Sequence, residues 1–189
     1  MRLIPRDSLT PMPWKNGGGI TREIACFPAG SGSAGFDWRI STAEVAADGP
    51  FSRFDGIDRR LYLLEGAGLD LRIGPDTMRL RPGEHVDFAG EVPVDGRLVD
   101  GAVSDLNIMV RRDRQQAHFA AAKVTGAAAI DLPWETAALF VLEGEIALAG
   151  ASPGVARRFD TVLLAPGHGR TLTVSGTATL LLIGFNAAA

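Results

Sequence analysis

A six-residue apolar segment ending in Glu-Gly occurs once in each half of this chain. Residues 61–66 read Leu-Tyr-Leu-Leu-Glu-Gly, and residues 139–144 read Leu-Phe-Val-Leu-Glu-Gly. Around both copies, short apolar segments alternate with turns, to which the 23 glycines and 11 prolines of the chain contribute. Short strands with closely spaced turn signals favour a sandwich or barrel, and an internal repeat indicates two copies of one unit. We therefore predict an all-β chain made of two similar barrels or jelly rolls.

The apolar segments also suggest where one domain ends and the next begins. In the first half we expect strands that include residues 20–27, 36–45, 61–64 and 106–110, and in the second half 138–142, 161–164 and 179–185. Between these two groups, residues 115–125 surround an alanine run and form the best candidate for a short helix or connector. We place the boundary there and predict an N-terminal barrel over 1–113 and a C-terminal barrel over 114–189.

The charge and cysteine content exclude several classes of protein. A net charge of -3 and a pI near 5.6 give no support for nucleic-acid binding, which usually requires a basic stripe. Cys26 is the single cysteine, so no intrachain disulfide is possible and a reducing compartment is expected. The N-terminus lacks the apolar core of a signal peptide, and no apolar run approaches the roughly 20 residues of a membrane span. We expect a cytoplasmic protein without a membrane partner.

A glycine-rich loop in residues 13–23 concentrates polar groups in the first half. Three consecutive glycines suit a sharp turn or a close backbone approach better than a strand interior. Lys15 and Arg22 flank them with donors suited to a carboxylate or phosphate. The loop is not a P-loop, because no strand precedes it and no Gly-Lys-Ser/Thr ends it. A plain surface loop is the alternative interpretation.

Further hydrogen-bond donors lie on the strands expected in the first half. Strand alternation places Arg39 and Ser41 on one face of segment 36–45, and Asn107 and Arg111 on one face of segment 106–110. The mouth of a small barrel is a common ligand site, and paired arginines are suited to carboxylates. We therefore predict a ligand-binding set that comprises Trp14, Lys15, Asn16, Arg22, Arg39, Ser41, Arg59, Asn107 and Arg111.

The alternative for these arginines is that they pair with nearby carboxylates, such as Glu23 and Glu44, and tie loops to the barrel. A metal site is not expected, because the three histidines, at positions 85, 118 and 168, are widely separated. No motif supports a Ser-His-Asp or Cys-His nucleophile. Carboxylates near turns are more often solvated or capping groups than catalytic acids or bases.

Beyond these residue patterns, the chain resembles the HutD/Ves family of bicupins. The resemblance covers nearly the whole chain and is densest up to about residue 112. It is carried by residues 12–19, 21–24, 36–41, 43–44, 48–54, 56–59 and 105–107. The resemblance implies two cupin barrels in one chain and an association with histidine-utilisation genes.

We accordingly expect a bicupin without metal or cofactor that binds a small carboxylate metabolite. A formylglutamate-like intermediate of histidine degradation fits best, and the role would be regulatory or protective. One alternative is a metal-free isomerase or hydrolase acting on such an acid, with Lys15 or Glu44 transferring the proton and Arg39 stabilising an oxyanion. Another is a structural or protein-binding module. The C-terminal half lacks a comparable donor set, so we expect it to be a packing partner or the surface of a homodimer.

Overall fold

The structure is a computed structural model that describes residues 1–32, 35–149 and 154–188. The chain forms two compact units. The N-terminal unit comprises Thr10–Gln115, and the C-terminal unit combines Met1–Leu9 with Gln116–Ala189. Where the sequence suggested domains of 1–113 and 114–189, the first nine residues group with the later part, because β1 (Arg2–Ile4) pairs with β15 (Thr161–Leu164).

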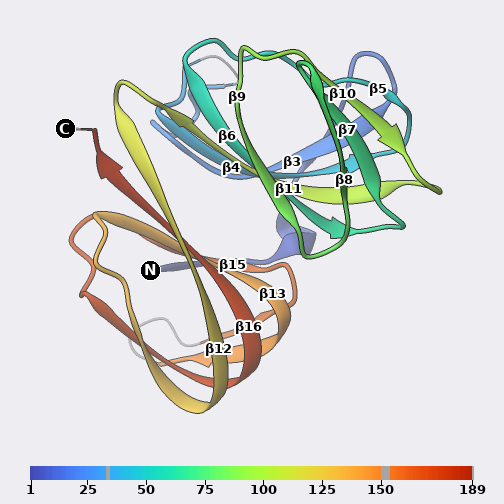
Figure 1. Cartoon of the computed structure of the whole chain (residues 1–189). Helices are drawn as coiled ribbons and strands as arrows, with labels where there is room; N and C mark the ends of the chain where they lie inside the picture. The colour runs from blue at the N-terminus through green and yellow to red at the C-terminus, as the bar shows by residue number, and fades with distance from the viewer. Residues whose placement is uncertain (33–34, 150–153, 189) are drawn as a thin grey trace. The chain divides into compact units, whose positions relative to one another are not determined.

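Almost all regular structure in the described residues is strand, which confirms the predicted all-β class (Figure 1). The exception in those residues is a single 3-10 turn, η1 (Arg6–Ser8). No helix of the described chain has the length and apolar character needed to cross a bilayer.

Two antiparallel sheets build the N-terminal unit. The larger sheet has the order β2-β3-β4-β11-β6-β9, and the smaller sheet has the order β5-β10-β7-β8. The larger sheet contains β2 (Pro11–Pro13), β3 (Gly19–Phe27), β4 (Trp38–Val45), β6 (Ile57–Glu65), β9 (His85–Ala89) and β11 (Val103–Arg111). The smaller sheet contains β5 (Gly49–Pro50), β7 (Leu69–Ile73), β8 (Asp76–Leu80) and β10 (Val94–Leu98).

A shared apolar core holds these two sheets together. Leu61 and Leu63 of β6 are fully buried and belong to the same cluster as Leu69 and Leu71 of β7. Leu80 of β8 completes this contact from the far edge of the smaller sheet. The larger sheet therefore buries one part of its inner face in the core, and the rest of that face is available to line a cavity.

The C-terminal unit is one sheet of order β1-β15-β13-β16-β12, with β14 paired to β13. Its remaining strands are β12 (Gln115–Asp131), β13 (Thr136–Leu148), β14 (Gly154–Arg157) and β16 (Thr171–Ala187). The prediction of a short helix or connector over 115–125 is wrong, because these residues belong to β12. Val124 and Ile130 are buried in the core with Ala128 packed against it, while Thr125 and Ala129 are exposed. Alternate burial along the strand thus overrides the helix preference of its alanines.

The two Leu-Glu-Gly repeats have the same local structure. In β6 the pairing with β11 shifts register so that Leu64 is bulged, and in β13 the pairing with β16 shifts so that Leu142 is bulged. The glycines that follow, Gly66 and Gly144, have φ of +112° and +75°, where a side chain would be strained. The sequence repeat therefore corresponds to a repeated strand, bulge and turn.

Candidate functional site

A cavity of about 640 Å³ opens on the inner face of the larger sheet of the N-terminal unit. Seven of the residues predicted to bind a ligand line it, namely Trp14, Lys15, Asn16, Arg39, Ser41, Arg59 and Asn107. Its apolar wall includes Met12, Phe51, Phe54 and Met109. A largely apolar pocket with a few convergent polar groups is the usual form of a small-molecule site.

Strand pairing explains how residues distant in sequence come together. Arg39 of β4 pairs with Met109 of β11, which in turn pairs with Arg59 of β6. One step along the sheet, Ser41 pairs with Asn107, and the next step brings Asp105 to the same face. Because side chains two residues apart point to the same side of a strand, this face presents two arginines, an amide and a carboxyl group to the cavity.

Arg59, Asn107 and Asp105 form a buried hydrogen-bonded chain. The Arg59 Nη2 donates to Asn107 Oδ1 at 2.8 Å, and the Asn107 Nδ2 donates to Asp105 Oδ1 at 2.7 Å. The bonds to Asn107 therefore assign its amide orientation, with the oxygen toward the cation and the nitrogen toward the carboxyl group. The Arg59 Nη1 also donates to the Ser52 carbonyl at 3.0 Å.

Aromatic rings surround the Arg59 guanidinium. Its central carbon lies 4.9 Å from the ring centre of Phe88, 5.4 Å from that of Phe54 and 5.9 Å from that of Phe51. Burial lowers the pKa of Arg59 to about 10, with Asp105 opposing this shift and Arg39 adding to it. Arg59 thus remains cationic at neutral pH, and the rings compensate part of the hydration that it loses.

Asp105 is the most deeply buried charged residue at the cavity, with no exposed surface. Burial raises the pKa of its carboxyl group to about 7, although the Arg59 charge and the Asn107 hydrogen bond oppose the shift. Its Oδ1 accepts from Asn107, whereas its Oδ2 has no hydrogen-bond partner within the described protein. A buried polar atom without a partner is unfavourable unless something else satisfies it.

Arg39 is held at one end by an ion pair. Its Nε lies 2.8 Å from Glu23 Oε2, and its side chain is only 10% exposed. Its two terminal nitrogens make no hydrogen bond to the part of the chain that the structure describes. The pair with Glu23 is one that the alternative interpretation of the arginines anticipated, yet it engages only one edge of the guanidinium.

The glycine-rich loop forms the rim of the cavity through Trp14, Lys15 and Asn16. The Trp14 indole nitrogen donates to Thr21 Oγ1 at 2.7 Å, which fixes the ring beside the sheet. At Gly19 a Cβ atom would lie 2.4 Å from the Glu44 carbonyl oxygen and 3.0 Å from the Trp14 ring. A side chain at position 19 would therefore collide with the Glu44 backbone and the Trp14 ring. This agrees with the close backbone approach that the sequence suggested for the glycine run.

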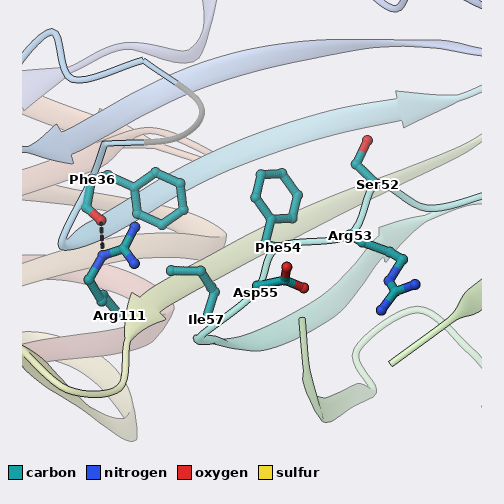
Figure 2. Close-up of a pocket in the computed structure, with 7 residues that line it drawn as sticks. All are labelled: Phe36, Ser52, Arg53, Phe54, Asp55, Ile57 and Arg111. Atoms are coloured by element: carbon teal, nitrogen blue, oxygen red, sulfur yellow. Dashed lines mark hydrogen bonds between the residues drawn. The ribbon is translucent and has the colours of Figure 1, made fainter. Parts of the chain in front are cut away.

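Two predicted residues are not part of this lining. Arg22 makes an ion pair with Glu44 at 2.7 Å. Arg111 lines a neighbouring pocket of about 440 Å³, and its Nε donates to the Phe36 carbonyl at 3.3 Å. Figure 2 shows this second pocket, in which Arg111 and Arg53 stand at opposite ends of a wall formed by Phe54 and Ile57.

Sequence reasoning missed Asp105, because the expected strand began at residue 106. Extending the alternation of Asn107 by two residues toward the N-terminus would have placed Asp105 on the same face. The register at Asp105 is also set by a bulge at Leu64 on the neighbouring strand. The sequence pattern does not indicate this bulge. Across residues 1–32, 35–149 and 154–188, no three metal-ligating side chains come together.

Sequence comparison places the chain among known proteins. The HutD family profile matches residues 6–182. An uncharacterized 21.2 kDa protein from the hutC 3′ region of Pseudomonas putida is 37% identical over 120 residues, which cover 63% of each protein. Protein Ves of Citrobacter koseri is 44% identical over 106 residues, which cover 55% of this chain and 54% of that protein. The chain thus aligns with a little over half the length of these relatives.

Solved structures agree with the sequence matches. HutD from Pseudomonas fluorescens superimposes with a TM-score of 0.85 and 28% identity, covering 100% of this chain and 99% of that one. A cupin 2 barrel protein from Leptotrichia buccalis, 12% identical, covers 97% of this chain and 100% of its own with a TM-score of 0.63, and shows that the fold is cupin-like. The family is linked to histidine utilisation by the names of these relatives. Because the profile match extends over nearly the whole chain, the protein belongs to the HutD family.

Proposed function

We propose that the protein binds a small carboxylate metabolite in the cavity of the N-terminal unit. A formylglutamate-like intermediate of histidine degradation fits best, with a regulatory or protective role and no bond-breaking step. The observation that carries the proposal is Arg39, which lines the cavity and whose two terminal guanidinium nitrogens have no partner among the described residues. A guanidinium edge is suited to bidentate binding of a carboxylate.

The charges and size of the cavity support this proposal. Arg39, Arg59 and Lys15 line it, and Asp105 is the single acidic residue in the described lining. Burial weakens the negative charge of that carboxyl group at neutral pH by raising its pKa to about 7. The cavity volume of about 640 Å³ lies within the range of small-molecule sites. The basic lining and the weakened charge of Asp105 favour an anion over a neutral or cationic ligand, and the volume suits a small molecule.

We also interpret the two units as two cupin barrels. The equivalent bulges at Leu64 and Leu142, each followed by a glycine turn, support a duplicated unit. In this interpretation the N-terminal barrel binds the ligand. The C-terminal barrel would then be a packing partner or the surface of a homodimer.

A second candidate function is a metal-free isomerase or hydrolase acting on the same acid. Glu44, one of the two residues expected to transfer the proton, pairs with Arg22 instead of lining the cavity. Asp105 is better suited, because its raised pKa of about 7 is near that of an effective general acid or base. Product formation during prolonged incubation with the acid would distinguish this function from binding alone.

Calorimetric titration with N-formylglutamate, formiminoglutamate, urocanate and histidine tests the proposal. Arg39→Ala is the informative variant, and Arg22→Ala is its matched control, because it removes the same charge from the same sheet outside the cavity. We expect one acid to bind, with affinity reduced at least about tenfold in Arg39→Ala and nearly unchanged in Arg22→Ala. Equal effects of both variants, or no binding of any acid to folded protein, would contradict the proposal.

A further inference from the structure

The unpartnered oxygen of Asp105 shows what the ligand must supply. Asp105 has no exposed surface, and within the described residues only Asn107 donates a hydrogen bond to it. Its second oxygen, Oδ2, has no partner, yet the residue lines the cavity. The Arg59 cation does not touch the carboxyl group directly, because Asn107 stands between them. Asp105 therefore lacks the direct ion pair that normally accompanies a buried carboxylate.

The hydrogen-bond chain also indicates where a proton on Asp105 would lie. Arg59 donates to Asn107 Oδ1, so the Asn107 nitrogen must face Asp105 as a donor. Oδ1 of Asp105 is then an acceptor, and an added proton is best placed on Oδ2. A protonated Oδ2 needs an acceptor, and none is provided by the described protein.

We propose that Asp105 binds the ligand in its protonated form and donates the Oδ2 hydrogen to a carboxylate oxygen of the acid. This inference rests on the proposed function, because it concerns the same cavity. Arg39 supplies the charge that balances the anion, and Asp105 supplies a neutral donor. An ionised Asp105 would instead repel the acid, so binding at alkaline pH takes up one proton from solution.

The other charged groups around the cavity do not provide this proton. Arg39, Arg59 and Lys15 line it as basic side chains. Glu23 of β3 accepts from Arg39 and is the nearest carboxylate linked to the lining. The three histidines are absent from the described lining. Asp105 is therefore the residue expected to couple protons to binding between pH 6 and 9.

The test is calorimetric titration of the full chain with N-formylglutamate from pH 6 to 9. Each pH is measured in two buffers of different ionisation enthalpy, which gives the number of protons taken up. For the wild type we expect constant affinity below about pH 7, a tenfold loss per pH unit above it, and uptake approaching one proton. The carboxylates of the ligand stay ionised over this range and contribute no protons.

Two variants make the assignment specific. Asp105→Asn keeps a donor in a neutral group of equal size but cannot titrate, so we expect its affinity not to change between pH 6 and 9 and no proton to be taken up. Glu23→Gln is the control, and it should retain the pH dependence even if its affinity changes. Binding by the wild type without proton uptake overturns this inference and leaves the proposed function intact. A pH dependence that persists in Asp105→Asn also overturns it, whereas no binding at all contradicts both.

Discussion

Asn107 and Asp105 stand two residues apart on β11, and the Asn107 amide donates to the Asp105 carboxyl group across 2.7 Å. The same amide accepts from Arg59 at 2.8 Å. One neutral side chain thereby joins a buried cation to a buried acid without a direct ion pair. This arrangement keeps both groups oriented toward the cavity, and it makes Asn107 the residue on which the polar network depends.

Replacing Asn107 with leucine should therefore destabilise the N-terminal unit. The substitution leaves Arg59 Nη2 and Asp105 Oδ1 buried without partners, and the expected loss in the free energy of unfolding is about 3 kcal/mol. Urea unfolding would measure it. Thr77→Ala, at an exposed position of β8, should change the same free energy by less than about 0.5 kcal/mol. Similar values for the two variants would contradict a central role for Asn107.

Asp105 should make stability fall as pH rises from about 4 to 7. The folded protein holds the proton up to a pKa of about 7, whereas the unfolded chain releases it near the ordinary value of 3.8. The folded state thus binds more protons in this window, and the free energy of unfolding falls by on the order of 4 kcal/mol across it. The stability that the bound proton contributes is therefore fully present below pH 3.8 and is lost above about pH 7.

Comparing Asp105→Asn with the wild type isolates this effect. The pKa of Glu91 is lowered to about 2 by its hydrogen bond to Arg112, so its contribution to stability rises with pH instead of falling. This contribution is the same in both proteins and cancels when they are compared. The difference between their free energies of unfolding, measured by urea titration from pH 4 to 8, should change steadily up to about pH 7. A difference that stays constant over that range would show that Asp105 ionises normally.

The glycine-rich loop offers a matched pair of substitutions. Gly19→Ala would place a Cβ atom 2.4 Å from the Glu44 carbonyl oxygen, so we expect a loss of about 2 kcal/mol in unfolding free energy. Gly18→Ala meets only the Asn16 side chain, at 3.4 Å, and should cost less than about 1 kcal/mol. Thermal unfolding of both proteins provides the comparison. An equal loss of stability in the two variants would contradict the claim that the nearby Glu44 carbonyl oxygen excludes a side chain at position 19.

Arg59 and Arg60 provide a comparison of neighbouring arginines. Arg59→Lys keeps the charge but loses the planar contact with Phe88 and one of the hydrogen bonds to Ser52 and Asn107, so a loss of about 2 kcal/mol is expected. Arg60→Lys affects a partly exposed pair with Asp87 and should cost about 0.5 kcal/mol or less. Denaturant unfolding distinguishes them, and a smaller loss at Arg59 than at Arg60 would contradict the buried network.

Part of this architecture was predictable from strand alternation. Arg39 and Ser41 were expected on one face of their strand, and both line the cavity. The repeat of residues 61–66 at 139–144 correctly indicated a recurring strand and turn. These predictions succeeded because side chains alternate between the two faces of a strand, so the face of each residue follows from the sequence of that strand alone.

The remaining features depend on pairing between distant segments. Arg22 was expected in the ligand-binding set, whereas the structure has a bulge at Ile24 and pairs Arg22 with Glu44, as the alternative interpretation of the arginines anticipated. The expected strand began at residue 106 and so left out Asp105, and the full burial of that residue follows from its neighbours on β4 and β6. The alanine run of β12 suggested a helix, since propensity ignores the strand β16 with which it pairs.

The most direct test of ligand binding in this cavity is the indole region of a ¹⁵N-labelled NMR spectrum. The protein has three tryptophans, of which Trp14 lines the cavity and Trp134 packs in the C-terminal unit. Single Trp→Phe variants would assign the three indole signals. On addition of N-formylglutamate, we predict a saturable shift of the Trp14 indole signal and none of the Trp134 signal. An unchanged Trp14 signal at saturating acid, or a shift confined to Trp134, would contradict binding at this site.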